Sequence, residues 1–369
     1  MKNLCITLFL LIFIISCKKH PAPEATRTFT MGVTPWPADF TTEAVDDAYS
    51  FIRDHCDRVS HHFDEGIPYD EAYHNAPMPP ALINDVQTRS GKTPAGMKVL
   101  LSVAALDITR HARAGYYQND TGVSDSIKNY WLQLPFNDSQ VVRAYVNYIS
   151  YLVEALHPDM VNYGVESNYF HWDAASFDQY KDFISHSFAL LKIKYPSINF
   201  FVSFMVNEDP SALSLAAQLI PYSDYIGLSA YPYTSGSSDA SGNTDPVNLP
   251  ADYFTKFIDL APSKPWGFAE TGYIAQDLII PSYNLNKHGR PEWQEAYLQK
   301  ICNLLNERKG KFLIWFCQAD YDAGCERLKQ LGLYQDLFGL WKDIGFKDEN
   351  GQLRPAFASW EAWKQRKLQ

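Results

Sequence analysis

Two glutamates come directly after short apolar runs that lie far apart in the chain. Glu166 follows the run 160–165, and Glu270 follows the run 266–269. A carboxylate at the end of a buried strand is costly unless it has a partner, so both residues are candidates for chemistry. Two carboxyl groups that face one cavity can cleave a glycosidic bond, one as the proton donor and one as the nucleophile. Repulsion between them raises the pKa of one, which then serves as the acid.

The elements that must position these glutamates alternate along the chain. Short apolar runs predict strands, and longer helical patterns predict helices between them. The predicted strands span 28–34, 58–63, 97–106, 160–165, 199–206, 224–230, 266–269 and 312–316. The clearest predicted helices span 41–55, 141–156 (with Ser139 as a cap), 177–195 (with Ser176 as a cap), 211–219 and 291–308.

This alternation predicts an α/β fold with a parallel sheet. Eight βα units over about 340 residues predict a single (β/α)8 TIM barrel, in which catalytic groups lie at the C-terminal ends of the strands. Both glutamates lie there. A doubly wound open sheet fits less well, because Pro-Trp-Pro at 35–37 stands where a Gly-rich phosphate loop is expected.

The N-terminus predicts export and lipidation. Lys2 precedes an apolar stretch at 4–15, which suits a signal peptide and is shorter than the roughly 20 residues of a membrane-spanning helix. The stretch ends in Ile-Ile-Ser-Cys, which resembles a bacterial lipobox and implies lipidation of Cys17. We therefore predict a lipoprotein signal peptide at 1–16, a tether at 17–27 and the barrel at 28–369. The predicted location is the bacterial cell envelope, periplasmic or at the cell surface, with the lipid anchor as the only membrane contact.

Charge and cysteine content bear on the partners. The formal net charge of −10 argues against a nucleic-acid partner, since that binding needs Lys and Arg to neutralise phosphates. The sequence has no CxxC and no Cys/His cluster with zinc spacing. His61, His62, Asp64 and Glu65 have the side chains of metal ligands, but adjacent residues of a strand point to opposite faces. We therefore predict no metal and no cofactor.

Glutamates after the fourth and seventh strands of an eightfold barrel resemble glycoside hydrolase clan A. The chain is most similar to the arabinogalactan endo-β-1,4-galactanase family and its uncharacterised relatives. The matching segments are 224–232, 268–272, the strand of Trp315 and the C-terminal segment 345–360. The resemblance implies a retaining hydrolase of a β-linked polysaccharide or oligosaccharide, with Glu166 as general acid/base and Glu270 as nucleophile. It also implies that Tyr231 hydrogen-bonds the nucleophile and that a sugar ring stacks on Trp315.

Further substrate contacts are expected from residues that follow strands, namely Trp36, Asn168, Tyr233 and one of His61 and His62. Asn207-Glu208 has the dipeptide usual for the acid/base of the clan but follows the fifth strand, so it is set aside.

Two departures from the clan pattern leave an alternative open. Val165 stands where the clan usually has Asn, and the end of the second strand lacks the Arg that the clan tends to place there. His61 or His62 could take over part of that role, and the sequence does not choose between them. The alternative is a catalytically inactive, carbohydrate-binding lipoprotein on the same barrel; a barrel enzyme of another reaction class is a third possibility.

Overall fold

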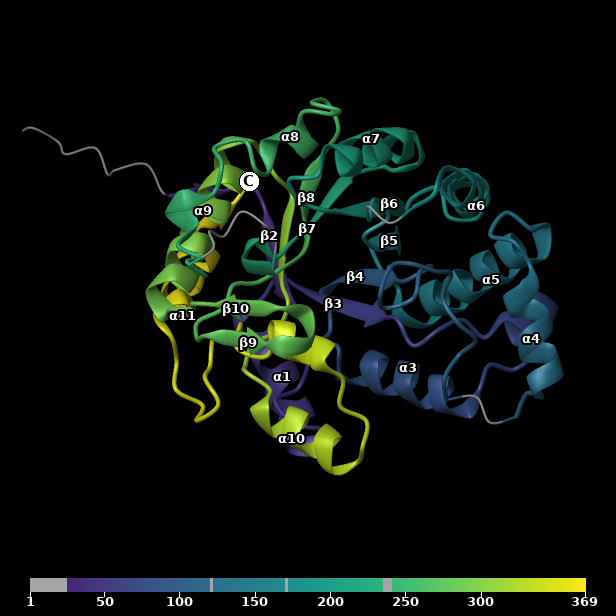
Figure 1. The fold of residues 1–369 in the computed structure, drawn as a ribbon, viewed down its shortest axis with the longest axis horizontal. Coiled ribbons are helices and arrows are strands. Elements are labelled where there is room, and N and C mark those ends of the chain that lie inside the picture. Colours follow the sequence, from purple (N-terminus) through teal and green to yellow (C-terminus); the bar gives the residue numbers. More distant parts are fainter. Residues whose placement is uncertain (1–24, 120–121, 170–171, 235–240) are drawn as a thin grey trace, which may run out of the picture.

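The computed structural model describes residues 25–119, 122–169, 172–234 and 241–369. Eight parallel strands close into a barrel in the order β11-β2-β3-β4-β5-β6-β7-β8 (Figure 1). They are β2 (Thr30–Val33), β3 (Arg58–Phe63), β4 (Lys98–Val103), β5 (Met160–Gly164), β6 (Asn199–Met205), β7 (Ile226–Ala230), β8 (Trp266–Thr271) and β11 (Phe312–Trp315). The eight predicted strands and the TIM-barrel architecture are thereby confirmed. The signal peptide and Cys17 lie outside the described residues.

Alternating side chains divide each strand between the inside of the barrel and the layer under the helices. On β3, Val59 and Phe63 pack in the main core between sheet and helices. Arg58 points the other way and places its guanidinium over the ring of Phe312, inside the barrel. The same period of two puts His62 on the inner face and His61 on the outer face. This settles the choice that the sequence left open.

The helices surround the barrel, as Figure 1 shows. Their bounds are α1 (Thr42–His55), α2 (Tyr69–His74), α3 (Pro80–Lys92), α4 (Asp125–Gln133), α5 (Ser139–Leu156), α6 (Ala174–Lys194), α7 (Pro210–Leu219), α8 (Thr255–Ile258), α9 (Pro291–Glu307), α10 (Asp322–Gln330) and α11 (Pro355–Lys364). The expected caps Ser139 and Ser176 are wrong. Asp138 and Asp173 accept the capping hydrogen bonds, which makes the two serines residues of the first turn.

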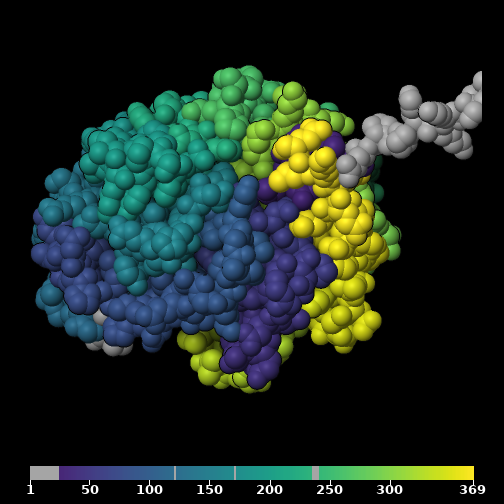
Figure 2. Space-filling model, turned by 180° about the vertical axis from the view of Figure 1, so that it is seen from behind, coloured from purple at the N-terminus to yellow at the C-terminus, as the bar shows by residue number. Residues whose placement is uncertain are grey.

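The two ends of the described chain meet beside the barrel. Strand β1 (Thr26–Arg27) pairs in parallel with β12 (Lys367–Leu368), so the last two residues of the predicted tether belong to the fold. Figure 2 shows the N-terminal and C-terminal segments side by side on the rear face. A hairpin of β9 (Leu278–Ile280) and β10 (Leu285–Lys287) extends the loop after β8. Within the described ranges, no helix has the length and apolar character needed to cross a bilayer.

Candidate active site

A β-bulge in β8 turns Glu270 toward the mouth of the barrel. The register against β7 runs from Leu228 opposite Phe268 directly to Ser229 opposite Glu270, and the register against β11 shifts over the same stretch. One extra residue on a strand re-aims the side chain that follows it. Ala269 faces the barrel interior, and Glu270 beyond it opens toward the mouth with 18% of its side chain exposed.

Glu270 is held by two neighbours that favour its ionised form. The hydroxyl of Tyr231 donates a 2.6 Å hydrogen bond to Oε1, and Nδ1 of His62 lies 3.5 Å from Oε2. Burial alone would raise the pKa of Glu270, but His62, Tyr231 and the charge of Arg110 together lower it. The predicted contact between Tyr231 and Glu270 is therefore present. An ionised carboxylate in this position is what a nucleophile requires.

His62 carries the complementary charge. Burial by itself would lower its pKa, but the hydrogen bond to Glu270 and the carboxylates of Asp64 and Glu270 raise it on balance. The raised pKa increases the cationic fraction of His62 beside Glu270, near the end of β3, where the clan pattern has an arginine. Its Nε2 is buried and has no hydrogen-bond partner among the described residues.

Glu166 follows β5 in an unusual backbone conformation. Its φ of 51° lies in the left-handed region, which non-glycine residues rarely adopt. The register between β5 and β6 shifts just before it, and its N–H donates a 3.0 Å hydrogen bond to Oγ of Ser203. These features turn the carboxylate of Glu166 into the barrel mouth, where 12% of the side chain is exposed.

Both carboxylate oxygens of Glu166 accept hydrogen bonds. Nε of Arg110 donates to Oε2 at 2.9 Å, and the hydroxyl of Ser229 donates to Oε1 at 2.6 Å. Arg110 belongs to the loop after β4, and its Nη1 donates to the backbone oxygen of Asp107 at 2.9 Å. Sequence reasoning missed Arg110 and Ser229, because only the closed barrel brings the loop after β4 and the end of β7 to Glu166.

Trp315 has no surface on which a sugar ring could stack. It is fully buried, its indole N–H donates a 2.8 Å hydrogen bond to the oxygen of Ile344, and its ring stacks on Phe346. The expectation that a sugar ring stacks on Trp315 is therefore wrong, and the reason is the alternation of side chains along β11. Phe312 and Ile314 face the barrel interior, so Trp315 faces the helices, and Phe316 is the next residue on the inner side.

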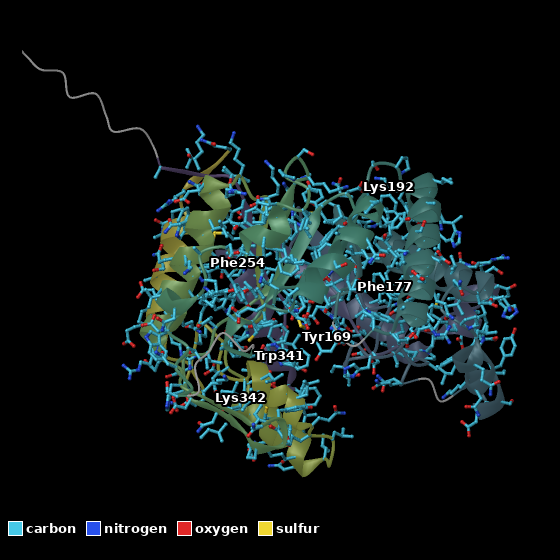
Figure 3. All side chains as sticks on the ribbon, turned by 45° about the horizontal axis from the view of Figure 1, so that its top comes forward. Tyr169, Phe177, Lys192, Phe254, Trp341 and Lys342 are labelled. Atoms are coloured by element: carbon cyan, nitrogen blue, oxygen red, sulfur yellow. The ribbon has the colours of Figure 1, made fainter. Side chains whose placement is uncertain are left out.

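An aromatic wall, made of Trp36, Phe316, Trp341 and Tyr231, leads to Glu270. The ring of Phe316 lies 6.0 Å from Trp36 and 6.1 Å from Trp341, and Trp341 lies 5.9 Å from Tyr231. Figure 3 shows Trp341 toward the centre of the molecule. The indole N–H groups of Trp36 and Trp341 are buried without a hydrogen-bond partner in the described part of the chain. Unpaired buried donors are rare, and these two have almost no accessible surface in this structure.

Three other expected contacts lie in the core instead of the site. His61 is fully buried and hydrogen-bonded to Thr93 at 2.9 Å, and burial lowers its pKa to about 3. Asn168 uses its amide to bind the backbone of Met205, and Tyr233 donates its hydroxyl to the oxygen of Leu340. Each of these side chains makes hydrogen bonds within the fold and is fully buried, so a substrate cannot contact it in this structure.

The described residues include one acidic group close enough to share an ion, formed by Asp320, Asp322 and Asp343. Lys342 donates to Asp322 and Asp343 at 2.6 and 2.5 Å, and Arg354 binds both oxygens of Asp320 at 2.7 and 2.5 Å. Each of the three carboxylates is thus paired with Lys342 or Arg354, and the cluster ties the segments after β11 together.

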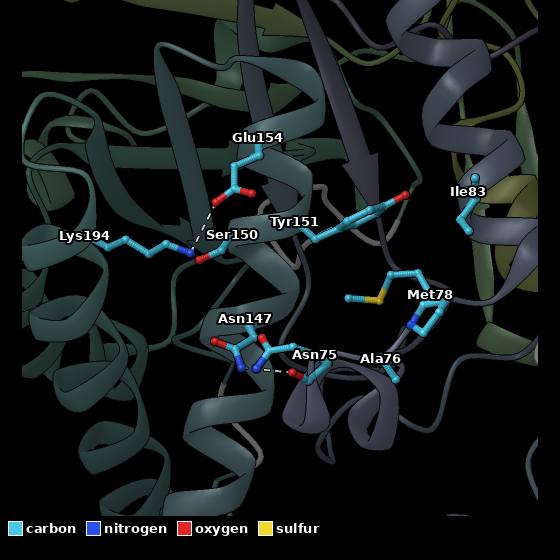
Figure 4. Close-up of a pocket in the computed structure, with 11 residues that line it drawn as sticks. Asn75, Ala76, Met78, Ile83, Asn147, Ser150, Tyr151, Glu154 and Lys194 are labelled. Atoms are coloured by element: carbon cyan, nitrogen blue, oxygen red, sulfur yellow. Dashed lines mark hydrogen bonds and ion pairs between the residues drawn. The ribbon is translucent and has the colours of Figure 1, made fainter.

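A groove of about 420 Å³ lies on the helical surface (Figure 4). It is lined by residues of α2, α3, α5 and the end of α6 with their connections, including Met78, Asn147, Tyr151 and Lys194. None of its lining residues comes from the loops that carry Glu166 and Glu270. The groove is thus separate from the two-glutamate site.

Comparison with known proteins places the fold. Neither a family model nor a curated protein matches the sequence. Similar solved structures include the exo-β-1,4-mannosidase Op5Man5 from Opitutaceae bacterium strain TAV5, at 14% identity and a TM-score of 0.62 over 92% of this chain and 60% of that one. A GH5_18 variant from Streptomyces cattleya, in complex with Manβ1-4GlcNAc, gives 14% identity, a TM-score of 0.61 and coverages of 91% and 80%.

A structure of fungal β-1,4-galactanases gives 12% identity and a TM-score of 0.54, covering 91% of this chain and 99% of that one. The chain shares the barrel fold of these glycosidases. At such low identity the likeness to the galactanases is no greater than the likeness to the mannosidase, so it does not distinguish between sugars.

Proposed function

We propose that the protein is a retaining β-glycoside hydrolase with Glu270 as nucleophile and Glu166 as general acid/base. The observation that carries the proposal is the pairing of Glu270 with Tyr231 and His62, which favours its carboxylate form at the mouth of the barrel. Glu166 faces the same mouth from β5. The similar solved structures, which include glycosidases for β-1,4 linkages, support this reaction class.

The proposed reaction has two steps. In the first, a carboxylate oxygen of Glu270 forms a bond to the anomeric carbon while the bond to the leaving oxygen breaks, and Glu166 gives that oxygen a proton. In the second, Glu166 removes a proton from water, the water oxygen binds the anomeric carbon, and the carboxylate of Glu270 is released. Tyr231 and His62 orient Glu270 throughout, and no cofactor enters either step.

The proposed substrate is a β-linked polysaccharide or oligosaccharide. The wall of Trp36, Phe316 and Trp341 offers apolar ring faces for a sugar. We further propose that Cys17 is lipidated and holds the enzyme at the cell envelope. A Cys17→Ser variant is then expected in the soluble fraction, and its continued membrane association contradicts the anchor.

Reducing-end release from β-1,4-mannan, β-1,4-galactan and β-1,4-xylan tests the activity. The wild type should release sugars from at least one of these, with the anomeric configuration retained in the first product seen by proton NMR. Glu270→Gln should abolish turnover and keep the melting temperature. The control is Glu208→Gln, an exposed glutamate after β6 that lies outside the site. Full activity in Glu270→Gln, or binding without product by the wild type on every glycan, contradicts the proposal.

A further inference from the structure

Glu166 and Arg110 share an unusual backbone conformation. Six non-glycine residues of the described ranges have positive φ, and four of them close a helix or follow its last turn, namely Asn75, His157, Asn284 and Lys309. The other two are Arg110 (φ 61°) and Glu166 (φ 51°), and they are bonded to each other. Strained residues that do not end a helix collect at functional sites.

The loop after β4 is built to present Arg110. The carboxylate of Asp107 accepts hydrogen bonds from the backbone N–H groups of His111 and Ala112, and the oxygen of Asp107 accepts from Nη1 of Arg110. The guanidinium is 9% exposed and meets a carboxylate that is 12% exposed. Because both charges are largely removed from water, loss of one leaves the other without its partner.

This contact bears on the protonation of Glu166. A guanidinium only donates hydrogen bonds, so Oε2 of Glu166 accepts from Arg110, and the largely buried cation beside it favours the carboxylate form of Glu166. Oε1 accepts from Ser229. The carboxylate form suits the second step of the proposed reaction, in which Glu166 is a base. It opposes the first step, in which Glu166 must give a proton to the leaving oxygen.

We infer that Arg110 is a positioning residue that holds Glu166 as a carboxylate and thereby limits acid assistance to bond cleavage. The inference rests on the proposed function for its catalytic consequence, and on geometry alone for the state of Glu166. It follows that substrates with poor leaving groups, which need a proton, are cleaved slowly until the hydrogen bond from Arg110 to Oε2 of Glu166 breaks. Nη2 of Arg110 has no hydrogen-bond partner among the described residues, so it can donate a hydrogen bond to a further acceptor.

The other groups around the pair come from several strand ends. Burial by itself would lower the pKa of Arg110, but the carboxylates of Glu166, Asp64 and Glu270 raise it on balance. His62 and Arg110 repel each other. The charge of Glu166 also acts on the phenols of Tyr231 and Tyr169. Of these groups, Arg110 is the only cation bonded to Glu166 in the described structure.

Replacing Arg110 tests the inference directly. In Arg110→Met, the 13C-carboxyl signal of Glu166, assigned with Glu166→Gln, should report loss of the carboxylate form at a higher pH than in the wild type. Arg110→Lys, which keeps a cation, should stay near the wild type. Arg113→Met, in the same loop but with its guanidinium over Tyr69, is the matched control and should leave the midpoint unchanged. This measurement needs no substrate, so it decides the inference even where the proposed function fails.

Kinetics on aryl and alkyl β-glycosides provide the second readout. Arg110→Met should narrow the ratio of kcat/KM between 4-nitrophenyl and methyl glycosides by at least about tenfold, and should move the basic limb of its pH profile upward. The inference is overturned if Arg110→Met lowers only the melting temperature and leaves unchanged the kcat/KM ratio of the two glycosides, the basic limb of the pH profile and the midpoint of the Glu166 signal. Arg110 then has a structural role. Failure of the wild type on all glycosides contradicts the proposed function alone, and the carboxyl titration then decides the role of Arg110.

Discussion

Ser229 and Tyr231, two positions apart at the end of β7, donate hydrogen bonds to different glutamates. Ser229 binds Glu166 and Tyr231 binds Glu270, each at 2.6 Å. Two residues of a strand span about 6.6 Å, so one strand end holds both carboxylates at the same side of the barrel. The residues that bring the two glutamates together thus belong to neither of their own strands.

We predict that Tyr231→Phe lowers kcat by roughly 10- to 150-fold, because a hydrogen bond to a charged group contributes about 1.5–3 kcal/mol. The hydrogen bond from Tyr231 helps to lower the pKa of Glu270, so its loss raises that pKa. As the proposed nucleophile, Glu270 must be ionised, and the acidic limb of the kcat profile should therefore move to higher pH. Steady-state kinetics across pH measure both effects.

Tyr233→Phe is the matched control, since the hydroxyl of Tyr233 binds the oxygen of Leu340 and leaves Glu270 untouched. It should lower the melting temperature and keep the acidic limb in place. If the two variants have the same pH profile, Tyr231 does not set the ionisation of Glu270.

The adjacent histidines should affect stability with opposite dependence on pH. The pKa of His62 is raised in the folded protein, so its contribution is complete below the unfolded value of about 6.5 and is lost as the pH rises through the folded pKa. His62→Gln should therefore cost more stability at pH 6 than at pH 9. The pKa of His61 is lowered to about 3, so the unfolded chain takes up a proton below about 6.5 and stability falls there.

His61→Gln should accordingly cost more stability at pH 7.5 than at pH 5, the reverse of His62→Gln. Urea unfolding of the wild type and both variants at these pH values measures the differences, and packing losses shift each variant by a similar amount at every pH. The same trend in both variants contradicts the assignment of one histidine to the barrel mouth and the other to the core.

Trp315 and Phe316 should separate stability from activity. Trp315→Phe removes the 2.8 Å hydrogen bond to the oxygen of Ile344, which keeps a 3.1 Å hydrogen bond from Gln294, and is expected to lower the free energy of unfolding by about 0.5–1.5 kcal/mol, with kcat/KM nearly unchanged. Phe316→Ala removes a ring from the aromatic wall and should lower kcat/KM several-fold, up to about tenfold. Denaturant unfolding and kinetics on the same preparations test the pair. An activity loss confined to Trp315→Phe contradicts the placement of the wall.

The sequence by itself determined the barrel and the strand ends that carry the glutamates. Apolar runs of strand length alternate with helical patterns, and this local order is enough to predict eight parallel strands. The prediction for β3, Arg58–Phe63, matches the structure residue for residue. Since parallel strands of a barrel point the same way, the prediction of Glu166 and Glu270 at the C-terminal ends of their strands already placed them at one end of the barrel; β8 itself extends through Glu270 to Thr271.

Only the tertiary structure decided which side chains face the substrate. A bulge in β8 and a left-handed residue after β5 aim Glu270 and Glu166, and neither irregularity follows from the apolar pattern. The same holds for Trp315. A tryptophan at a strand end suggested a surface for sugar stacking, but its position on β11 points the side chain toward the helices and buries it. Arg110 reaches Glu166 from a loop 56 positions earlier in the chain. Such contacts depend on the closure of the barrel, because strand periodicity fixes a face only relative to neighbouring residues, while closure fixes which loops meet across the mouth.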